Sequence, residues 1–437
     1  MKPLALFLAV ASPVVVFAAD PADAVSSIIA KEKDSLIGLY QHLHANPELS
    51  FHEEKTSQRM AEEMRKLGFE VTEKIGGWGV VAVLKNGPGK TILVRTDLDA
   101  LPVREITGLS FASKVKTKDD QGNEVSVMHA CGHDMHMTCW VGTAKALVAM
   151  KDQWKGTLVF IGQPAEERSG GAAPMIKDGL FEKFPKPDLC LALHCGAEGA
   201  AGTLGITPGG ATASVDNIDI VVHGIGGHGA QPQATKDPVL IASQLVIALQ
   251  TIASRETHPL DAVVITVGSI HGGTKHNIIG DRVDLQLTVR TTSEETRYKV
   301  LEAIKRIARG VGLTAGLPED LLPEVKTNDL YTPVVMNDDK LVQKLTGLFE
   351  ANFGKDKVKQ TKPTMGGEDF SRYGMTKDKL PICMFWLGAT PAEKVKEAAK
   401  TNEPLPSLHS PFFRPDAVPA METGVKAMSL AVLECLK

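Results

Sequence analysis

The spacing of apolar positions predicts two helices at the start of the folded chain. Between residues 23 and 46 apolar side chains recur at helical spacing, and Pro47 marks the end of that helix. Ser50-Phe51-His52-Glu53 has the form of a capping box, in which a serine hydroxyl and a glutamate satisfy the first backbone N–H groups. We therefore expect a second helix from this motif to Gly68.

Continuous apolar segments that alternate with helical patterns follow. Strands are expected around residue 71 and at 80–84, 90–95, 156–162 and 189–193, with helices at 137–150 and 173–181. Strands without polar alternation are typical of a mostly parallel sheet that helices cover on both faces. The predicted fold class is therefore α/β.

A different pattern begins near residue 209. Strands are expected at 215–222, 262–269, 277–290 and 323–327, and helices at 237–255 and 292–310. This βαββαβ order predicts an α+β ferredoxin-like unit. After residue 331 the α/β pattern resumes, with a helix at 338–353, a strand at 382–387 and a closing helix at 417–436. We expect a main domain at 19–208 and 329–437 and an inserted lid domain at 209–328.

The first residues have the pattern of a secretory signal. Lys2 precedes an apolar run at 4–17, and Val16-Phe17-Ala18 offers small residues at the spacing that signal peptidase requires. The run is too short for a membrane span. We predict a signal peptide at 1–18 and an exported mature chain, periplasmic or secreted.

Composition and charge limit the class of partner. The chain has 437 residues, of which 43% are hydrophobic and 23% charged, as in folded proteins of two or three domains. A net charge of -4 and a pI of about 6.4 give no general affinity for nucleic acid or for an anionic membrane. The six cysteines are scattered and do not read as a disulfide framework. A small molecule or short peptide is the expected partner, with no membrane association after signal cleavage.

Polar residues gather where the expected parallel strands end. The residues at these ends are Asp97, Glu166, Glu167 and His194. The loop at 128–136, which joins two of the strands, adds Cys131 and His133, and a helix start is expected to stabilise the Cys131 thiolate. Because the carboxyl ends of parallel strands meet at one edge of a sheet, we expect these side chains to converge.

The converging donors suit divalent metal ions. Pooled, they are Cys131, His133, Glu167 and His194, with His409 as a candidate from far along the chain. Sulfur, nitrogen and oxygen donors in this number can hold two adjacent ions that activate a water molecule. Glu166 lies beside one ligand on an irregular loop and suits the general base. Taken singly, the glutamates could stabilise a helix start, and each histidine could be structural, but their convergence favours the metal site.

Six motifs, in order along the chain, resemble one known family. They are His42–Ser50, Arg95–Pro102, the loop His129–His136, Ala165-Glu166-Glu167, Met365–Phe370 and Leu408-His409-Ser410-Pro411. Together they resemble the dinuclear metallopeptidases of the aminoacylase and carboxypeptidase class, in the branch of hippurate hydrolases and auxin-conjugate amidohydrolases. The resemblance implies the five ligands named above, Glu166 as the base and a catalytic domain with a dimerising lid.

Further roles rest on the resemblance or on position. The resemblance implies that His228 polarises the scissile carbonyl, with Asn277 as its assistant. Arg290, at the end of a lid strand, either pairs with a substrate carboxylate or is a surface arginine. Asp97 and Asp99 either orient the ligands or cap the turn after their strand.

The expected activity is metal-dependent hydrolysis of N-acyl amino acids, similar to hippurate, with Zn²⁺ as the first and Mn²⁺ as the second choice of metal. A carboxypeptidase or dipeptidase that acts on short peptides is the alternative, and a periplasmic solute-binding protein is a weaker one. Asn46, Gly280 and Gly367 depart from residues common in the family. None of them is a proposed ligand, so they bear on substrate preference.

Overall fold

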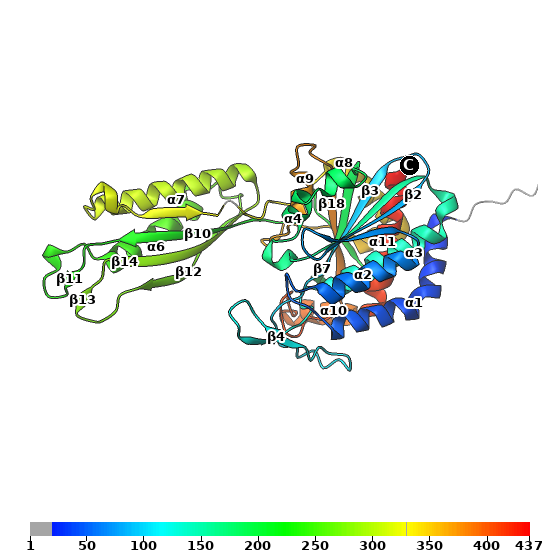
Figure 1. Cartoon of the computed structure of the whole chain (residues 1–437), viewed down its shortest axis with the longest axis horizontal. Helices are drawn as coiled ribbons and strands as arrows, with labels where there is room; N and C mark the ends of the chain where they lie inside the picture. Colours follow the sequence, from blue (N-terminus) through cyan, green and yellow to red (C-terminus); the bar gives the residue numbers. More distant parts are fainter. Residues whose placement is uncertain (1–19, 329) are drawn as a thin grey trace, which may run out of the picture.

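The structure is a computed structural model that describes residues 20–328 and 330–437, so the predicted signal peptide lies outside the described residues. A large sheet with its covering helices and a smaller α+β unit form two bodies joined by two chain connections (Figure 1). Each body has its own hydrophobic core. The predicted domain boundaries at 209 and 328 stay a prediction.

The large sheet has eight strands in the order β1-β2-β6-β3-β7-β18-β8-β17. Their bounds are β1 (Glu70–Ile75), β2 (Gly79–Asn86), β6 (Gly156–Gln163), β3 (Thr91–Asp97), β7 (Leu189–Ala200), β18 (Ile382–Thr390), β8 (Leu204–Ile206) and β17 (Val358–Gln360). The central strands β6, β3, β7 and β18 are parallel, whereas β1, β2 and β8 run antiparallel to a neighbour. The predicted α/β class is confirmed.

Helices cover both faces of this sheet, which explains why the residues of its central strands β3, β6 and β18 are almost all buried. One face carries α1 (Pro21–Ala45), α2 (Glu54–Lys66), α3 (His133–Ala149), α8 (Asp339–Phe353) and α11 (Ala417–Leu436), and the other carries α4 (Ala172–Lys177), α5 (Leu180–Lys183) and α9 (Ser371–Gly374). Within β3, Ile92 and Val94 pack into the first core and Leu93 into the second.

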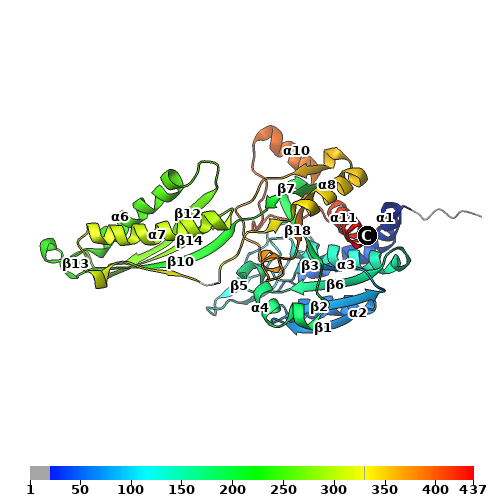
Figure 2. The ribbon, with the colours of Figure 1, turned by 90° about the horizontal axis from the view of Figure 1, so that it is seen from above.

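The smaller unit, the lid, has the predicted βαββαβ order. Its elements are β10 (Ser214–His223), α6 (Pro238–Thr251), β12 (Val263–Gly272), β14 (Arg282–Thr291), α7 (Glu294–Thr314) and β15 (Glu324–Thr327). The sheet order β12-β14-β10-β15, with contacts from both helices, is ferredoxin-like. Seen from above, the lid extends away from the large sheet (Figure 2).

Shorter elements complete the chain. They are the hairpin β4 (Lys116–Lys118) and β5 (Glu124–Ser126), the pair β9 (Gly209–Gly210) and β16 (Met336–Asn337), the pair β11 (Gly227–His228) and β13 (Ile278–Ile279), and helix α10 (Ala392–Thr401). The spacing of apolar residues did not predict α10, in which no residue is buried.

The predicted capping box is wrong. α2 begins at Glu54 with no cap from the Glu53 side chain, and Glu48 Oε2 accepts the backbone N–H of Thr56 in its first turn at 2.7 Å. The Ser50 hydroxyl donates instead to Asp99 Oδ2 over 2.6 Å. Glu53 is fully buried, and its Oε1 accepts the backbone N–H of Ala165 at 2.7 Å. The motif therefore supports the loop after β6 rather than the start of a helix.

Candidate metal centre

The register of three parallel strands brings the predicted residues to one edge of the large sheet. Asp97, at the end of β3, pairs with Gln163 at the end of β6. On the other side of β3, Arg95 pairs with Ala192, which lies two residues before His194 on β7. The convergence predicted for the strand ends is therefore present in the structure.

The loop before α3 delivers the cysteine and the first histidine. His133 is the first residue of α3 and follows Gly132, whose φ of 86° is in the left-handed region. A Cβ at Gly132 would lie 3.1 Å from the Cβ of Cys195. Glycine is therefore required both for the backbone turn and for its approach to β7.

The candidate ligand atoms form two overlapping groups that share Glu167. Donor atoms of Cys131, Glu167 and His409 lie within 4.8 Å of one another, and so do those of His133, Glu166 and Glu167. Cys131 Sγ is also 3.6 Å from His194 Nε2. All five predicted ligands are thus brought together, in an arrangement suited to two adjacent cations.

Hydrogen bonds orient two of the histidines as metal ligands. Nδ1 of His133 donates to the backbone oxygen of Asp99, and Nδ1 of His194 donates to that of Cys195, both at 2.8 Å. This leaves Nε2 of each ring for the site, as is usual for metal-binding histidines. Nε2 of His133 and Oε1 of Glu167 are buried, have no hydrogen-bond partner among the residues that the structure describes, and lie 3.7 Å apart.

His136 has a different role, although it lies in the same cluster. Its Nδ1 donates to Asp97 Oδ1 and its Nε2 accepts the backbone N–H of Cys195, each over 2.8 Å. Both ring nitrogens are therefore occupied. Asp97 in turn accepts Arg95 Nη1 at 2.8 Å, so its carboxylate is held by protein groups on both oxygens.

Asp99 contacts two candidate ligands. Its Oδ2 accepts the backbone N–H of Glu167 at 3.0 Å, and its backbone oxygen accepts His133 Nδ1. Its carboxylate therefore supports the ligand loops, not the turn that follows its own strand.

The charges of the side chains in the site favour the binding of cations. Burial raises the pKa of the Cys131 thiol well above its usual value, and Glu167 and Glu166 raise it further, so a thiolate at this position calls for a bound cation in addition to the helix start. Burial favours a neutral His133, but Asp97 and Asp99 outweigh burial and raise its pKa to about 10. A proton on His133 thus balances the carboxylates, and a divalent ion would displace it and the thiol proton.

The pKa of each of the other two candidate ligand histidines, His194 and His409, is lowered. Burial and the neighbouring His136 hold the pKa of His194 well below its usual value. Burial also lowers the pKa of His409, whose ring is 3.5 Å from Glu167 Oε2 and whose backbone N–H donates to Ala130. His409 is about half exposed, so it lies on the open side of the cluster.

Glu166 has the environment of a general base that holds its proton strongly. Its side chain is buried, and burial together with the neighbouring Glu368 and Glu167 raises its pKa well above the usual value. A base with a raised pKa takes a proton readily and returns it to a leaving group.

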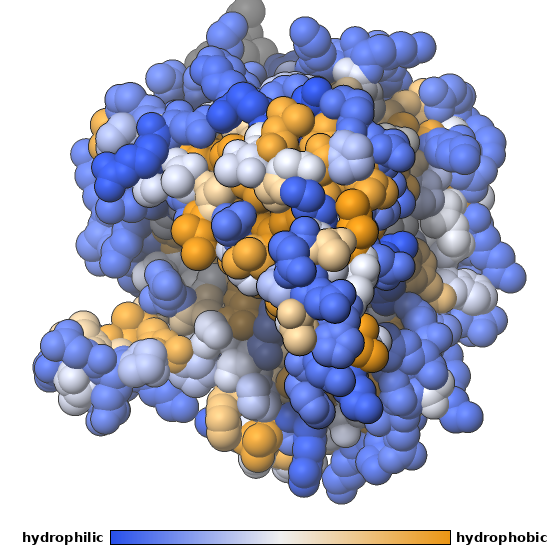
Figure 3. All heavy atoms as spheres, turned by 90° about the vertical axis from the view of Figure 1, so that its left-hand side faces the viewer, coloured by the Kyte–Doolittle hydropathy of each residue, from blue (hydrophilic) through white to orange (hydrophobic). Residues whose placement is uncertain are grey.

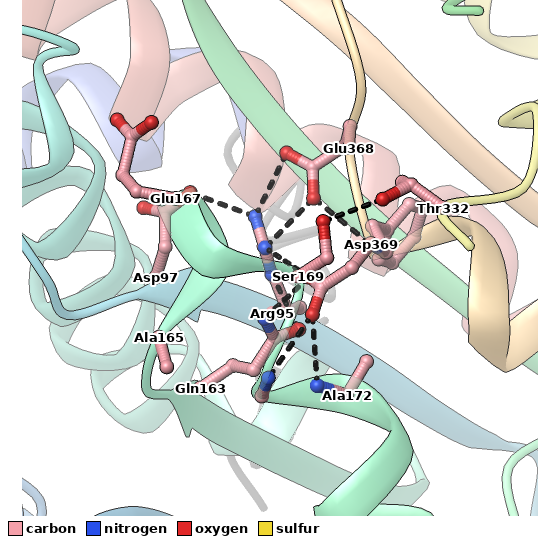
Figure 4. A network of polar contacts seen from close by, with 12 residues as sticks. Arg95, Asp97, Gln163, Ala165, Glu167, Ser169, Ala172, Thr332, Glu368 and Asp369 are labelled. Atoms are coloured by element: carbon pink, nitrogen blue, oxygen red, sulfur yellow. Dashed lines mark hydrogen bonds and ion pairs between the residues drawn. The ribbon is translucent and has the colours of Figure 1, made fainter. Parts of the chain in front are cut away.

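A buried polar network beside Glu166 was not predicted from the sequence (Figure 4). Nη2 of Arg95 donates a hydrogen bond to Oε1 of Glu368 at 2.8 Å, and Nε of Arg95 donates one to Oε1 of Gln163 at 3.2 Å. Gln163 donates to Asp369 Oδ1 at 2.5 Å, and Asp369 Oδ2 accepts the backbone N–H of Ala172. The signal that could have revealed this network is a charged residue inside the apolar strand β3.

Three predicted lid residues lie apart from this cluster. His228 and Asn277 belong to the β11/β13 region, at the end of the lid farthest from the large sheet (Figure 1). Nδ1 of His228 accepts the backbone N–H of Ala230, which leaves Nε2–H as a donor. Arg290 lies near the base of the lid, where Nη1 donates to the backbone oxygen of Met365 at 2.8 Å.

Comparisons with known proteins agree with this geometry. The model of Peptidase family M20/M25/M40 matches residues 93–433. The chain is 38% identical to the hippurate hydrolase of Campylobacter jejuni, over 75% of this chain and 82% of that protein. It is 36% identical to thermostable carboxypeptidase 2 of Saccharolobus solfataricus, over 86% of this chain and 91% of that protein.

A solved structure from Bacillus subtilis, described as a dinuclear metal-binding peptidase of the M20 family, superposes with a TM-score of 0.75 at 29% identity. It covers 93% of this chain and 99% of its own length. These matches exclude the solute-binding alternative and support dinuclear metal binding at the cluster. The chain therefore belongs to Peptidase family M20/M25/M40, and it is a metal-dependent hydrolase of amide or peptide bonds.

Proposed function

We propose that the protein hydrolyses the amide bond of N-acyl amino acids, with two divalent ions held by Cys131, His133, Glu167, His194 and His409. The observation that carries this proposal is the pair of donor groups that share Glu167 beside the buried Glu166. Zn²⁺ is the first choice because thiolate and imidazole donors suit it, and Mn²⁺ is the second.

The residues around the cluster define the steps of the reaction. When bound, the two ions polarise the scissile carbonyl and lower the pKa of a water molecule. Glu166 takes the proton of that water and later gives it to the leaving amine. His228 Nε2–H stabilises the developing oxyanion, and Arg290 pairs with the free carboxylate of the amino acid.

The substrate class rests on relatives. The chain resembles a hippurate hydrolase and carboxypeptidases at similar identity, so cleavage of short peptides is the second candidate. N-acetyldiaminopimelate deacetylase of Bacillus velezensis, at 37% identity, favours N-acyl amino acids.

The lid surface supports a homodimer. Side chains of α6 that face solvent include Val239, Leu240 and Ile247, and the last is 73% exposed. Figure 3, which looks at the lid end of the molecule, shows hydrophobic side chains exposed among hydrophilic ones at this end. β12 is also an edge strand of the lid sheet, with Ile270 half exposed. A second copy would cover this surface, and its lid could bring His228 to the cluster of the first.

The helical segment Pro238–Glu256, which includes α6, is long and apolar enough to cross a membrane by length and composition. One side of α6 packs in the lid core through Ile241, Leu245 and Leu249, so the dimer accounts for the other side.

Export is a further part of the proposal and rests on the apolar run at 4–17. N-terminal sequencing of the protein recovered from outside the cytoplasm would test it, with Ala19 expected as the first residue.

The function is tested by metal analysis coupled to a substrate panel. We expect two bound divalent ions per chain, and hydrolysis of N-benzoylglycine or N-acetyl amino acids at rates well above those for dipeptides. Faster cleavage of dipeptides would favour the second candidate, and no turnover of either class would refute both.

A further inference from the structure

The loop that carries Glu166 and Glu167 is held in an unfavourable backbone conformation. Ala165 and Ser169, at its two ends, have φ angles of 50° and 49°, although neither is glycine. Such residues persist only where surrounding contacts fix them. Glu53 and Asp99 supply two of these contacts from the large domain, through the backbone N–H groups of Ala165 and Glu167.

A third contact comes from the connection to the lid. The Ser169 hydroxyl lies 2.5 Å from the hydroxyl of Thr332, a residue of the segment that returns from the lid (Figure 4). Thr332 is buried, and its backbone exchanges two hydrogen bonds with Val215, the second residue of β10. Ser169 therefore touches the place where the returning segment pairs with the start of β10.

The segment around Thr332 is linked to the lid through Arg297. The guanidinium of Arg297 on α7 stacks 3.3 Å from the ring centroid of Tyr331, the neighbour of Thr332. Arg297 also forms a bidentate, buried ion pair with Asp216 on β10, at 2.6 and 2.8 Å. A change in the orientation of the lid would therefore move Thr332.

The loop that carries Glu368 meets the same connections. The backbone oxygen of Gly366 accepts the N–H of Ala213 at 2.9 Å. A Cβ at Gly367 would lie 2.6 Å from a methyl carbon of Val215. Both loops that border Glu166 are thus packed against the base of the lid.

We propose that Ser169 and Thr332 are positioning residues, whose hydroxyl pair transmits the orientation of the lid to the Glu166-Glu167 loop and so sets the placement of the shared ligand Glu167. This inference rests on the proposed metal site. It assigns a role in ligand placement to two hydroxyl groups that do not themselves bind substrate or metal.

The test replaces hydroxyl groups without changing size. Thr332→Val and Ser169→Ala remove the pair, Thr332→Ser keeps a hydroxyl, and the double variant tests whether the two act as one unit. The matched control is Thr291→Val, because Thr291 and Ser214 form a similar buried hydroxyl pair at 2.7 Å near the lid base. Thermal unfolding of each variant verifies that it is folded.

The probe is Co²⁺ alone, whose visible absorption reports the ligands around the ion without any need for substrate. We expect Thr332→Val and Ser169→Ala each to lower Co²⁺ affinity about tenfold and to change the spectrum, with no further loss in the double variant. Thr332→Ser should restore both readouts, and Thr291→Val should match the wild type. Turnover of N-benzoylglycine is measured in parallel.

Wild-type affinity and spectrum in Thr332→Val and Ser169→Ala would overturn the inference. An equal loss in Thr291→Val, or no recovery in Thr332→Ser, would also overturn it, because the effect would then be general loosening of the lid base. A wild-type protein that binds Co²⁺ but cleaves no substrate would contradict the proposed function, while the Co²⁺ comparison would still decide the role of the two hydroxyl groups.

Discussion

Arg95 and Glu368 form a buried ion pair, with Nη2 2.8 Å from Oε1, between β3 and the loop before α9. Neither side chain has appreciable exposure. Through Nη1 the same guanidinium holds Asp97, which orients His136. One cation thus links the carboxylates behind Glu166 to the strand end that supports the metal cluster (Figure 4).

Replacing Arg95 should therefore lower the free energy of unfolding. In Arg95→Met the buried carboxylates of Asp97 and Glu368 lose their counter-ion, and we expect about 3–5 kcal/mol of destabilisation. Arg95→Lys should recover part of this loss, since lysine supplies the charge but not the planar fork. The measurement is the shift of the unfolding transition of the large domain.

The exposed pair Lys116–Glu124, at 2.8 Å, is the matched control. Lys116→Met should change stability by less than about 1 kcal/mol, because solvent screens exposed ion pairs. Equal effects at the two positions would show that the buried network adds no stability.

Most of the fold could be predicted because its pattern is local. The continuous apolar strands of the sheet and the βαββαβ order of the lid follow from burial on one or two faces, and the last helix, α11, has the predicted bounds at residues 417 and 436. The capping box failed because the preference of Ser50 for a backbone N–H was overridden by Asp99, a partner distant in sequence.

Part of the site could also be predicted because its sequence pattern is local. Strand ends identify Glu167 and His194, and the convergence of these ends follows from strand register. The loop before α3 supplies Cys131 and His133, whereas His409 could be named only from its motif far along the chain. Glu368 lies 273 residues after Arg95 on the chain, and no spacing rule relates the two residues. Nor does spacing give the position of His228, because the direction in which the lid extends depends on tertiary packing (Figure 2).

Substitutions of the adjacent residues Glu166 and Glu167 should have different effects on turnover and metal content. Glu166→Gln removes the base but no proposed ligand, so we expect a loss of turnover of about 10²–10⁴-fold with metal content unchanged. Glu167→Gln weakens the ligand that both donor groups share and should lower metal content as well. Elemental analysis and kcat on the same preparations distinguish the two, and full activity in Glu166→Gln would refute its assignment.

Because of His44, the free energy of unfolding should fall as the pH becomes alkaline. Burial favours its neutral ring, but hydrogen bonds to Asp134 at 2.7 Å and Glu105 at 2.9 Å outweigh burial and raise its pKa to about 9, from an ordinary value of 6.5. A raised pKa in the folded state stabilises the fold fully below pH 6.5, and this contribution is lost as pH rises through 9. Loss of this contribution should lower the free energy of unfolding by about 3 kcal/mol.

The measurement is the unfolding temperature between pH 6.5 and 9 in metal-free buffer. The wild type should lose stability across this window, and His44→Gln should show a lower but flatter curve. A parallel decline in His44→Gln would assign the pH dependence to other groups.

If the lid of one subunit serves the site of the other, activity should depend on dimerisation. Ile247→Lys places a charge on the most exposed apolar position of α6 and should give a monomer in light scattering. Because His228 lies at the far end of its own lid, this monomer should also lose turnover while keeping its metal (Figure 1). Lys299→Ala, on the exposed surface of α7, is a control that should remain dimeric and active.

Mixed dimers test which subunit supplies His228. Glu166→Gln and His228→Ala should each be inactive alone, since one lacks the base and the other the oxyanion donor. After the two are unfolded together and refolded, about half of the dimers should be hybrids, and each hybrid should contain one site with an intact Glu166 from one chain and an intact His228 from the other. Recovery of about a quarter of wild-type kcat is therefore expected. No recovery, with hybrids verified by mass, would mean that His228 acts within its own chain, and full activity of His228→Ala alone would mean that His228 has no part in the reaction.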